Sequence, residues 1–326
     1  MIYESYSSMP FRQVVENIVD IWILVFSVFI IRLFISRYRN RAEPGEHAGQ
    51  LGVSETTDIN NPVGTIDEHL DKLNAWRLPA IALTPTSERG SSRIGGLPSL
   101  PDDVTWPHWK GEPLAFLCQL NLAEIPQDCN RQGLPASGML YFFYCQEQET
   151  WGFDPKDEGS WQVIYSATPS ATPRAAPRGL KVTYPEKVVS FGAVQTYPDW
   201  QDDRVDALNL SDHQMDLYMD MCSGVFAESP AHHLFGYPSP VQGNYMDLQC
   251  QLASNGLYLG GPEGYESPQA KALEAGRSDW ILLLQWDTDD DVEMMWGDAG
   301  MLYFWIRKQD LASGRFDKCW MVLQCA

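Results

Sequence analysis

The chain has 326 residues, of which 44% are hydrophobic and 20% charged, and its 12 Trp, 14 Tyr and 13 Phe can fill a core, which excludes a wholly disordered protein. The formal net charge is −20, and residues 42–326 hold 18 Lys and Arg against 40 Asp and Glu, a net −22. Such an acidic domain repels phosphate backbones, so we expect no nucleic-acid partner and favour a basic protein or a metal ion.

The first predicted element is a membrane-spanning helix. Residues 21–31 (IWILVFSVFII) are uncharged, and the arginines that follow are Arg32, Arg37, Arg39 and Arg41. With its flanks the run approaches the length that spans a bilayer, and the basic side marks the cytoplasm. We therefore predict an N-terminal tail (1–17), a transmembrane anchor (18–36) and a flexible tether (37–64). The chain would then be a single-pass membrane protein with a cytoplasmic C-terminal domain. The alternative is a buried or interfacial helix.

The remaining residues, 65–326, are expected to form one α+β domain. Helical patterns begin at Thr65 and cover about 202–221 and 267–276. Apolar runs predict strands at about 80–83, 114–119, 139–145, 161–166, 181–184, 188–191, 280–286, 301–307 and 319–324. The proline-rich segment 166–179 cannot continue a sheet and is typical of a linker.

Part of this domain is duplicated. The string Gly-Met-Leu-Tyr-Phe occurs at 138–142 and again at 300–304, and each copy follows an apolar run that ends in Gln. The two pseudo-repeats, about 93–166 and 232–324, each predict a three-strand antiparallel meander after a Gly-x-Pro loop. One meander alone would leave its apolar face bare. We therefore expect an α+β, internally duplicated antiparallel sheet domain with flanking helices, behind a single N-terminal transmembrane helix.

Several motifs resemble those of the YwqG-like family, a bacterial domain of unknown function. They are Ser92–Pro98, Trp106-Pro107, Leu114–Leu122, His233–Pro238 with Gln242, Leu282–Asp287 and Trp296–Ile306, in this order over about residues 66–326. The resemblance implies an α+β fold with an internal duplication. It also implies an interaction or toxin-immunity role, because some members occur near polymorphic-toxin and secretion genes. It supplies no catalytic residues.

The densest carboxylate cluster lies in the segment 287–298. Asp287, Asp289, Asp291 and Asp298 fall at positions 1, 3, 5 and 12 of a calcium-loop pattern. Val292 stands where that pattern needs a glycine, and position 12 lacks the bidentate Glu. The main prediction is a solvated acidic hairpin without a cofactor. The alternative is a calcium or magnesium site held by these four carboxylates.

The histidine pair of the sequence is His232-His233. Adjacent side chains of an extended segment point to opposite sides, so the two cannot easily share one metal ion. His233 is a candidate general base beside Tyr237 and Asp247. The alternative, which we favour because no nucleophile accompanies it, is a structural hydrogen bond in the following Gly-Tyr-Pro turn.

Two glutamines, Gln119 and Gln285, end the duplicated apolar strands. A buried amide needs hydrogen-bond partners, and we predict that each binds backbone groups of the opposing Gly-x-Pro loop across the pseudo-twofold axis. The alternative is a ligand cleft between the halves, lined by Trp106, Trp109, Gln119, Tyr237, Gln242, Gln285 and Trp296. The tryptophans are also expected as core anchors, which is the favoured interpretation.

Charge, duplication and the lack of a catalytic motif favour a membrane-anchored binding module over an enzyme. Its acidic surface would engage a basic protein, such as a toxin. One alternative is a metal-assisted hydrolase that uses Asp287, Asp289, Asp291 and His233. Another is a small-ligand binder in the cleft between the halves.

Overall fold

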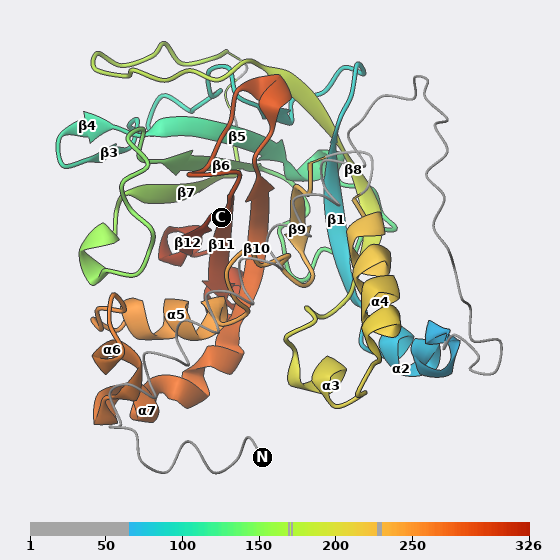
Figure 1. The fold of residues 1–326 in the computed structure, drawn as a ribbon. Coiled ribbons are helices and arrows are strands. Elements are labelled where there is room, and N and C mark those ends of the chain that lie inside the picture. The colour runs from blue at the N-terminus through green and yellow to red at the C-terminus, as the bar shows by residue number, and fades with distance from the viewer. Residues whose placement is uncertain (1–64, 169, 171, 227–229) are drawn as a thin grey trace, which may run out of the picture. The chain divides into compact units, whose positions relative to one another are not determined.

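The computed structural model describes residues 65–326 except 169, 171 and 227–229, and Figure 1 shows their arrangement. The strands are β1 (Leu78–Pro85), β2 (Arg93–Ile94), β3 (His108–Trp109), β4 (Glu112–Pro113), β5 (Ala115–Asn121), β6 (Met139–Tyr144), β7 (Trp161–Ser166), β8 (Lys187–Thr196), β9 (His233–Phe235), β10 (Trp280–Asp287), β11 (Met301–Arg307) and β12 (Trp320–Gln324). The α-helices are α2 (Leu70–Ala75), α3 (Asp203–Asp206), α4 (Asp212–Gly224), α5 (Met246–Ala253), α6 (Glu263–Glu266), α7 (Pro268–Leu273) and α8 (Lys308–Ala312). The 3-10 turns are η1 (Ile66–His69), η2 (Leu122–Glu124), η3 (Pro155–Asp157), η4 (Glu274–Asp279), η5 (Asp290–Val292) and η6 (Phe316–Lys318).

The structure corrects two predictions, the transmembrane helix in the fold class and the localisation as a single-pass membrane protein. The predicted anchor (18–36), with its tail and tether, lies outside the described residues. Within the part that the structure describes, no helix is long and apolar enough to cross a membrane. The longest of these helices, α4, has 13 residues, whereas a bilayer core requires roughly 20. The fold is a mostly antiparallel sheet domain with helices, and the prediction of a single-pass membrane protein is wrong on this finding.

Ten strands form one sheet in the order β12-β11-β10-β9-β1-β8-β2-β5-β6-β7. Every neighbouring pair in it is antiparallel. The runs β5–β6–β7 and β10–β11–β12 are therefore the two ends of one sheet and not separate units. β3 and β4 pair in a small ribbon of their own.

The two repeats exchange strands at the centre of this sheet. β1 precedes the first repeat along the chain but pairs with β9 of the second, and β8 precedes the second repeat but pairs with β2 of the first. β1 and β8 also pair with each other, from Leu78 opposite Thr196 to Pro85 opposite Val189. The strand order is thus symmetric about the β1–β8 pair, which binds the halves through backbone hydrogen bonds.

The same irregularity recurs in both halves. β5 shifts register between Phe116 and Cys118, and β10 shifts register between Leu282 and Leu284. A β-bulge bends its strand and increases the local twist. Such bending suits a sheet whose two ends pack against each other, as the ring contact between Trp161 of β7 and Trp320 of β12 shows at 4.9 Å.

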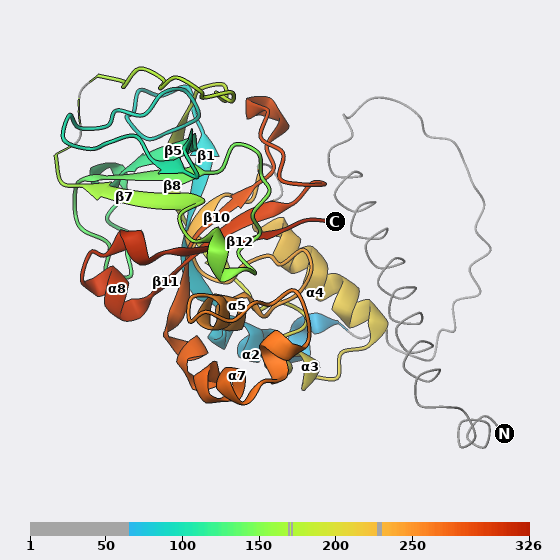
Figure 2. The same ribbon diagram turned by 90° about the vertical axis from the view of Figure 1, so that its left-hand side faces the viewer.

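The core lies between the two ends of the sheet, and every residue of β6 is buried. A second, smaller core of Leu73, Val205 and Tyr218 joins η1, α2, α3 and α4, which we call the helical unit. Figures 1 and 2 place α2, α3, α5 and α7 toward one end of the molecule and β5 and β7 toward the other.

Candidate functional site

Gln119 holds the Gly-x-Pro loop of the first repeat. Its side-chain oxygen accepts a hydrogen bond from the Ser99 N–H at 2.8 Å, and its amide nitrogen donates to the Ser91 carbonyl at 2.8 Å. The Tyr141 hydroxyl donates to the Ser99 carbonyl at 2.7 Å. Burial raises the pKa of Tyr141 to about 12, against a smaller opposing effect of Arg93, so the hydroxyl keeps its proton and remains a donor.

The second repeat reproduces these contacts. Gln285 accepts from the Ser239 N–H at 2.7 Å and donates to the Ala231 carbonyl at 2.9 Å. The Tyr303 hydroxyl donates to the Ser239 carbonyl at 2.7 Å. Each glutamine binds backbone groups beside a Gly-x-Pro loop, as predicted. The prediction that this loop belongs to the opposing repeat is wrong. Each glutamine binds the loop of its own repeat, because β2 and β9 lie directly beside β5 and β10.

His232 is completely buried among the residues that end β10. Its Nδ1 accepts a hydrogen bond from the Asp287 N–H at 3.0 Å, so the neutral ring carries its proton on Nε2. That nitrogen lies 3.6 Å from Oδ2 of Asp289, and the ring stacks on Trp286 at 4.1 Å. Burial acts to raise the pKa of Asp289, but His232 and the Asp291 N–H outweigh it, so the pKa of this carboxyl lies below its ordinary value.

The four carboxylates predicted as metal ligands have different surroundings. Asp287 accepts from the Ala231 N–H at 3.0 Å, and Asp291 pairs with Lys187 at 2.6 Å. Asp298 is exposed. In residues 65–326, apart from the five undescribed positions, no three His, Cys, Asp or Glu side chains are grouped so as to hold a metal ion. The Asp289 side chain caps the turn η5 by accepting from the Asp291 N–H, and the turn ends at Glu293, whose backbone is left-handed.

His233 is also fully buried, and its Nδ1 donates to the Phe235 carbonyl at 2.7 Å while its ring stacks on Phe226 at 5.0 Å. Burial lowers the pKa of His233 to about 4. The groups predicted to assist it are engaged elsewhere: the Tyr237 hydroxyl accepts from Arg204 at 3.0 Å, and Asp247 is paired with Arg277 at 2.8 Å. The ring of His233 thus makes a backbone hydrogen bond, but its acceptor is the Phe235 carbonyl and not a group of the Gly-Tyr-Pro turn.

Two of the residues predicted to line a ligand cleft, Trp106 and Trp296, are buried in the core. Trp106 packs edge-on against Phe143, and its Nε1 donates to the Leu114 carbonyl at 2.9 Å. Trp296 is fully buried, and its Nε1 donates to the Asp287 carbonyl at 3.1 Å. Of the other members, Trp109 lies under the Lys110 ammonium, and the Gln242 N–H donates to Gln324.

Two surface cavities instead involve residues that the sequence did not single out. One, of about 460 Å³, is lined by Leu78, Pro79, Asn130, Gln132, Ile281, Lys308 and Leu311. The other, of about 450 Å³, is lined by Leu257, Tyr258, Gly260, Gly261, Glu263, Gly264, Ser267 and Gln269. None of the predicted cleft residues lines either cavity.

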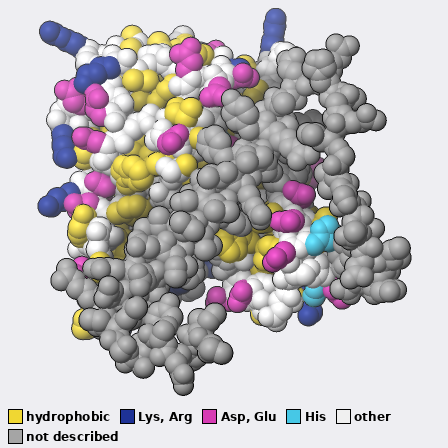
Figure 3. Space-filling model, viewed as in Figure 1, with side chains coloured by type: hydrophobic (Ala, Val, Ile, Leu, Met, Phe, Trp, Pro, Cys, Tyr) yellow, Lys and Arg dark blue, Asp and Glu magenta, His cyan; other side chains and the backbone are white. Residues whose placement is uncertain are grey.

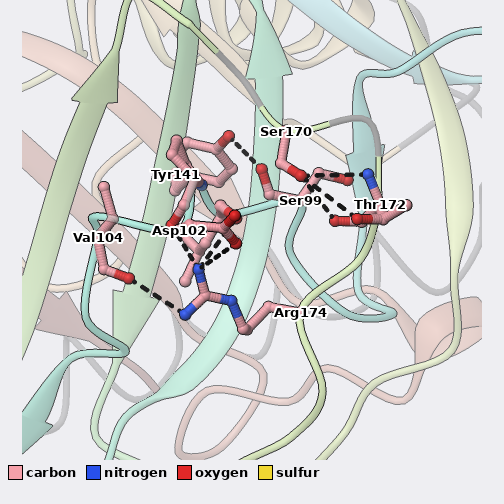
Figure 4. A network of polar contacts seen from close by, with 9 residues as sticks. Ser99, Asp102, Val104, Tyr141, Ser170, Thr172 and Arg174 are labelled. Carbon is pink, nitrogen blue, oxygen red and sulfur yellow. Dashed lines mark hydrogen bonds and ion pairs between the residues drawn. The ribbon is translucent and has the colours of Figure 1, made fainter.

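Arg174 is a binding residue that the sequence reasoning missed. Its N–H donates to the Pro98 carbonyl at 2.8 Å, and its guanidinium reaches into the loop Pro98–Val104 (Figure 4). That group donates to three backbone carbonyls, those of Leu100, Pro101 and Val104. It also lies 3.6 Å from Oδ1 of Asp102. The only signal in the sequence was a basic residue between two prolines in a segment otherwise typical of a linker.

Comparison with curated proteins gives no match. The model of one protein family matches residues 92–325, which include both repeats and every site residue named above except Ser91 and the cavity residues Leu78 and Pro79. This match covers well over half of the chain. The protein therefore belongs to the family described as a domain of unknown function, DUF1963.

Proposed function

We propose that this member of the family is YwqG-like and acts as a binding module for a basic protein. The observation that carries the proposal is a row of three aspartates, Asp212, Asp216 and Asp220, which we call the acidic stripe. They follow one another at intervals of four residues along α4, and all three are exposed. Residues four apart lie on the same face of a helix, so the stripe presents three carboxylates in line.

The helix that carries the stripe is stabilised by an N-terminal cap and by contacts with the rest of the helical unit. Ser211 caps it in a capping box: the Ser211 hydroxyl oxygen accepts from the Gln214 N–H, and the Gln214 side-chain oxygen accepts from the Ser211 N–H. The Gln214 amide also donates to Glu68 of η1 at 2.7 Å, and Tyr218 is fully buried in the small core. The opposite face of α4 therefore fixes the direction in which the stripe points.

Parts of the stripe cost stability in the isolated protein, although Asp212 lies in the first turn of α4, where a negative charge is favourable. Like charges at a spacing of four destabilise a helix by about 0.2–0.5 kcal/mol per pair, and Asp220 lies near the helix C-terminus, where a negative charge is also unfavourable. No ion pair within the described residues involves any of the three. A row of lysines or arginines on a partner would turn this repulsion into attraction.

The surroundings of the stripe strengthen the same field. Two further exposed aspartates, Asp203 and Asp206, lie on α3 of the same unit. Figure 3 shows Asp and Glu side chains at the lower right, where α2–α4 lie in Figure 1. A basic toxin, as the resemblance implies, is one partner that would fit this chemistry.

The test is capture of proteins from a cell extract by the immobilised full-length chain at about 0.05 M salt, with release at about 0.5 M. The charge variant is Asp212→Asn with Asp216→Asn and Asp220→Asn. The matched control, Asp103→Asn with Asp128→Asn and Glu149→Gln, removes three exposed carboxylates elsewhere. We expect one basic protein that the wild type and the control retain and the charge variant loses, with a Kd that weakens at least about tenfold when remeasured with the purified partner. Equal retention by both variants would contradict the proposal.

A further inference from the structure

The loop Pro98–Val104 receives an arginine from outside its own sheet. Arg174 is the donor in all of its hydrogen bonds to the loop. Its backbone N–H and its guanidinium donate, and backbone carbonyls of the loop accept. Hydrogen bonds from a charged donor are stronger than neutral ones. Because the receiving groups are backbone carbonyls held by the fold, the loop forms a prepared site for a guanidinium.

The loop is held in this shape without help from Arg174. Gln119 binds the Ser99 N–H and Tyr141 binds the Ser99 carbonyl, and both of these side chains come from the sheet. The Val104 N–H donates to the Pro101 carbonyl at 3.1 Å, which closes a turn within the loop. Removal of the arginine should therefore leave the carbonyl groups in place.

The segment that brings the arginine, Thr172–Gly179, has few other attachments. Six of its eight residues are exposed, the exceptions being Arg174 and Pro177. Pro173 and Pro177 have no N–H to donate, so the segment cannot add backbone bonds at these positions. Its far end is held where the Gln146 amide donates to the Gly179 carbonyl at 3.2 Å. Arg174 is thus the residue that attaches this segment to the loop, and just before the segment the Ser170 N–H donates to the Ser99 carbonyl at 3.3 Å.

The second repeat satisfies the corresponding loop in a different way. There Gln324 accepts from the Val241 and Gln242 N–H groups at 2.9 and 3.1 Å and donates to the Gly243 carbonyl at 3.0 Å. Gln324 lies within β12 and is 2% exposed, so it cannot leave without breaking the sheet. Among the described residues, only the first repeat has a charged side chain that donates to the backbone carbonyls of this loop, since Arg204 near the second loop donates to the Tyr237 hydroxyl.

We propose that the loop Pro98–Val104 is a docking site for an extended peptide with an arginine next to a proline, and that Thr172–Gly179 is its internal occupant. A partner peptide of this chemistry displaces the segment and places its own guanidinium on the carbonyls of Leu100, Pro101 and Val104. This surface lies on the first repeat, away from the acidic stripe, so the inference does not depend on the proposed function.

The internal occupant sets the affinity of the site. A tethered ligand acts at an effective concentration on the order of millimolar, so a partner peptide must compete with it. The guanidinium supplies a fork of donors that a lysine ammonium lacks, and it keeps its charge at any physiological pH. The site should therefore prefer arginine to lysine and should open when Arg174 is removed.

The experiment uses the full-length Arg174→Ala variant and a fluorescent synthetic peptide with the sequence Thr-Pro-Arg-Ala-Ala-Pro, which is that of residues 172–177. We expect saturable binding to this variant, at least about tenfold tighter than to the wild type. The same peptide with alanine in place of arginine should not bind, and the lysine peptide should bind more weakly. Adding Asp102→Asn should weaken binding of the arginine peptide, whereas adding Asp103→Asn should not.

Near-UV circular dichroism and the thermal unfolding midpoint establish that the Arg174→Ala variant is folded. The Arg174→Lys variant, which keeps a cation on the segment, should show intermediate binding of the peptide. Absence of saturable binding to the folded alanine variant would overturn the proposal. So would equal binding of the arginine and alanine peptides, or the formation of a dimer by exchange of the segment between two copies in place of peptide binding.

Discussion

Phe142 and Phe304 pack edge to face in the core, with ring centroids 5.2 Å apart and ring planes at 74°. They are the last residues of the two Gly-Met-Leu-Tyr-Phe strings, so the repeat contacts itself at equivalent positions. Trp161 and Trp320, which begin the edge strands of the two halves, make a second contact of this kind at 4.9 Å. The pseudo-twofold axis therefore passes through a packed core, not through an open cleft.

The contact between the two phenylalanines should be measurable as a coupling free energy in a double-mutant cycle. We expect Phe142→Leu and Phe304→Leu each to lower the free energy of unfolding by about 1–2 kcal/mol. The double variant should lose less than the sum, by about 1 kcal/mol, because the edge-to-face interaction is lost only once. Chemical denaturation of the four proteins gives this number. Phe116→Leu, whose ring contacts Phe143, serves as the control and should be additive with Phe304→Leu.

The two buried glutamines should be of equal importance to stability. Gln119→Leu leaves the Ser99 N–H and the Ser91 carbonyl unpaired, and Gln285→Leu does the same to the equivalent groups of the second repeat. Each change should lower the free energy of unfolding by about 2–4 kcal/mol. Exposed Gln242→Leu should change it by less than about 0.5 kcal/mol. A large inequality between the two buried sites would contradict the equivalence of the loops.

Local patterns predicted the three strands of each meander well, because strands such as β6 and β11 are continuous apolar runs bounded by turn residues, but they missed the short strands β2, β3, β4 and β9. They could not predict the exchange of β1 and β8. The pairing of Leu78 with Thr196 joins residues far apart in the chain, and no local pattern specifies which of two apolar strands lies beside which. The sheet order therefore had to come from the structure.

The site residues divide in the same way. The glutamines were found because a polar residue at the end of an apolar run stands out, and such a residue needs partners. Arg174 was missed because its partners are backbone carbonyls, which every residue carries and no sequence pattern marks. The role of His233 depends on its burial and on the Phe235 carbonyl that accepts from its Nδ1, so the identity of the residue alone could not separate a base from a structural residue.

His233 should make the domain less stable in mild acid. Its pKa is about 4 in the folded protein, against an ordinary value of about 6.5 in the unfolded chain, because burial disfavours the charged ring. Between these two pH values the unfolded state binds more protons, so the free energy of unfolding falls as the pH is lowered from about 6.5 to about 4. The full effect is about 3 kcal/mol and is complete below pH 4.

Denaturation curves recorded across this pH range test that expectation. The matched variant is His233→Asn, whose side-chain amide can donate to the Phe235 carbonyl as Nδ1 does but does not titrate. The wild type should lose about 3 kcal/mol more than the variant between pH 6.5 and pH 4. Parallel curves for the two proteins would show that the histidine is not held neutral by burial.

The exchange of β1 and β8 predicts that the two halves stay together when the chain between them is cut. A protease site placed between Ala175 and Ala176, which are both exposed, separates β1–β7 from β8–β12. In the intact sheet β8 pairs with β1 and β2, so the two fragments remain joined by backbone hydrogen bonds. We expect them to elute together in size-exclusion chromatography, with the amide protons of β8 protected from exchange. A C-terminal fragment expressed alone should leave β8 unprotected, since its strand partners lie on the other fragment. Elution of the cut halves as separate folded species would contradict the exchanged topology.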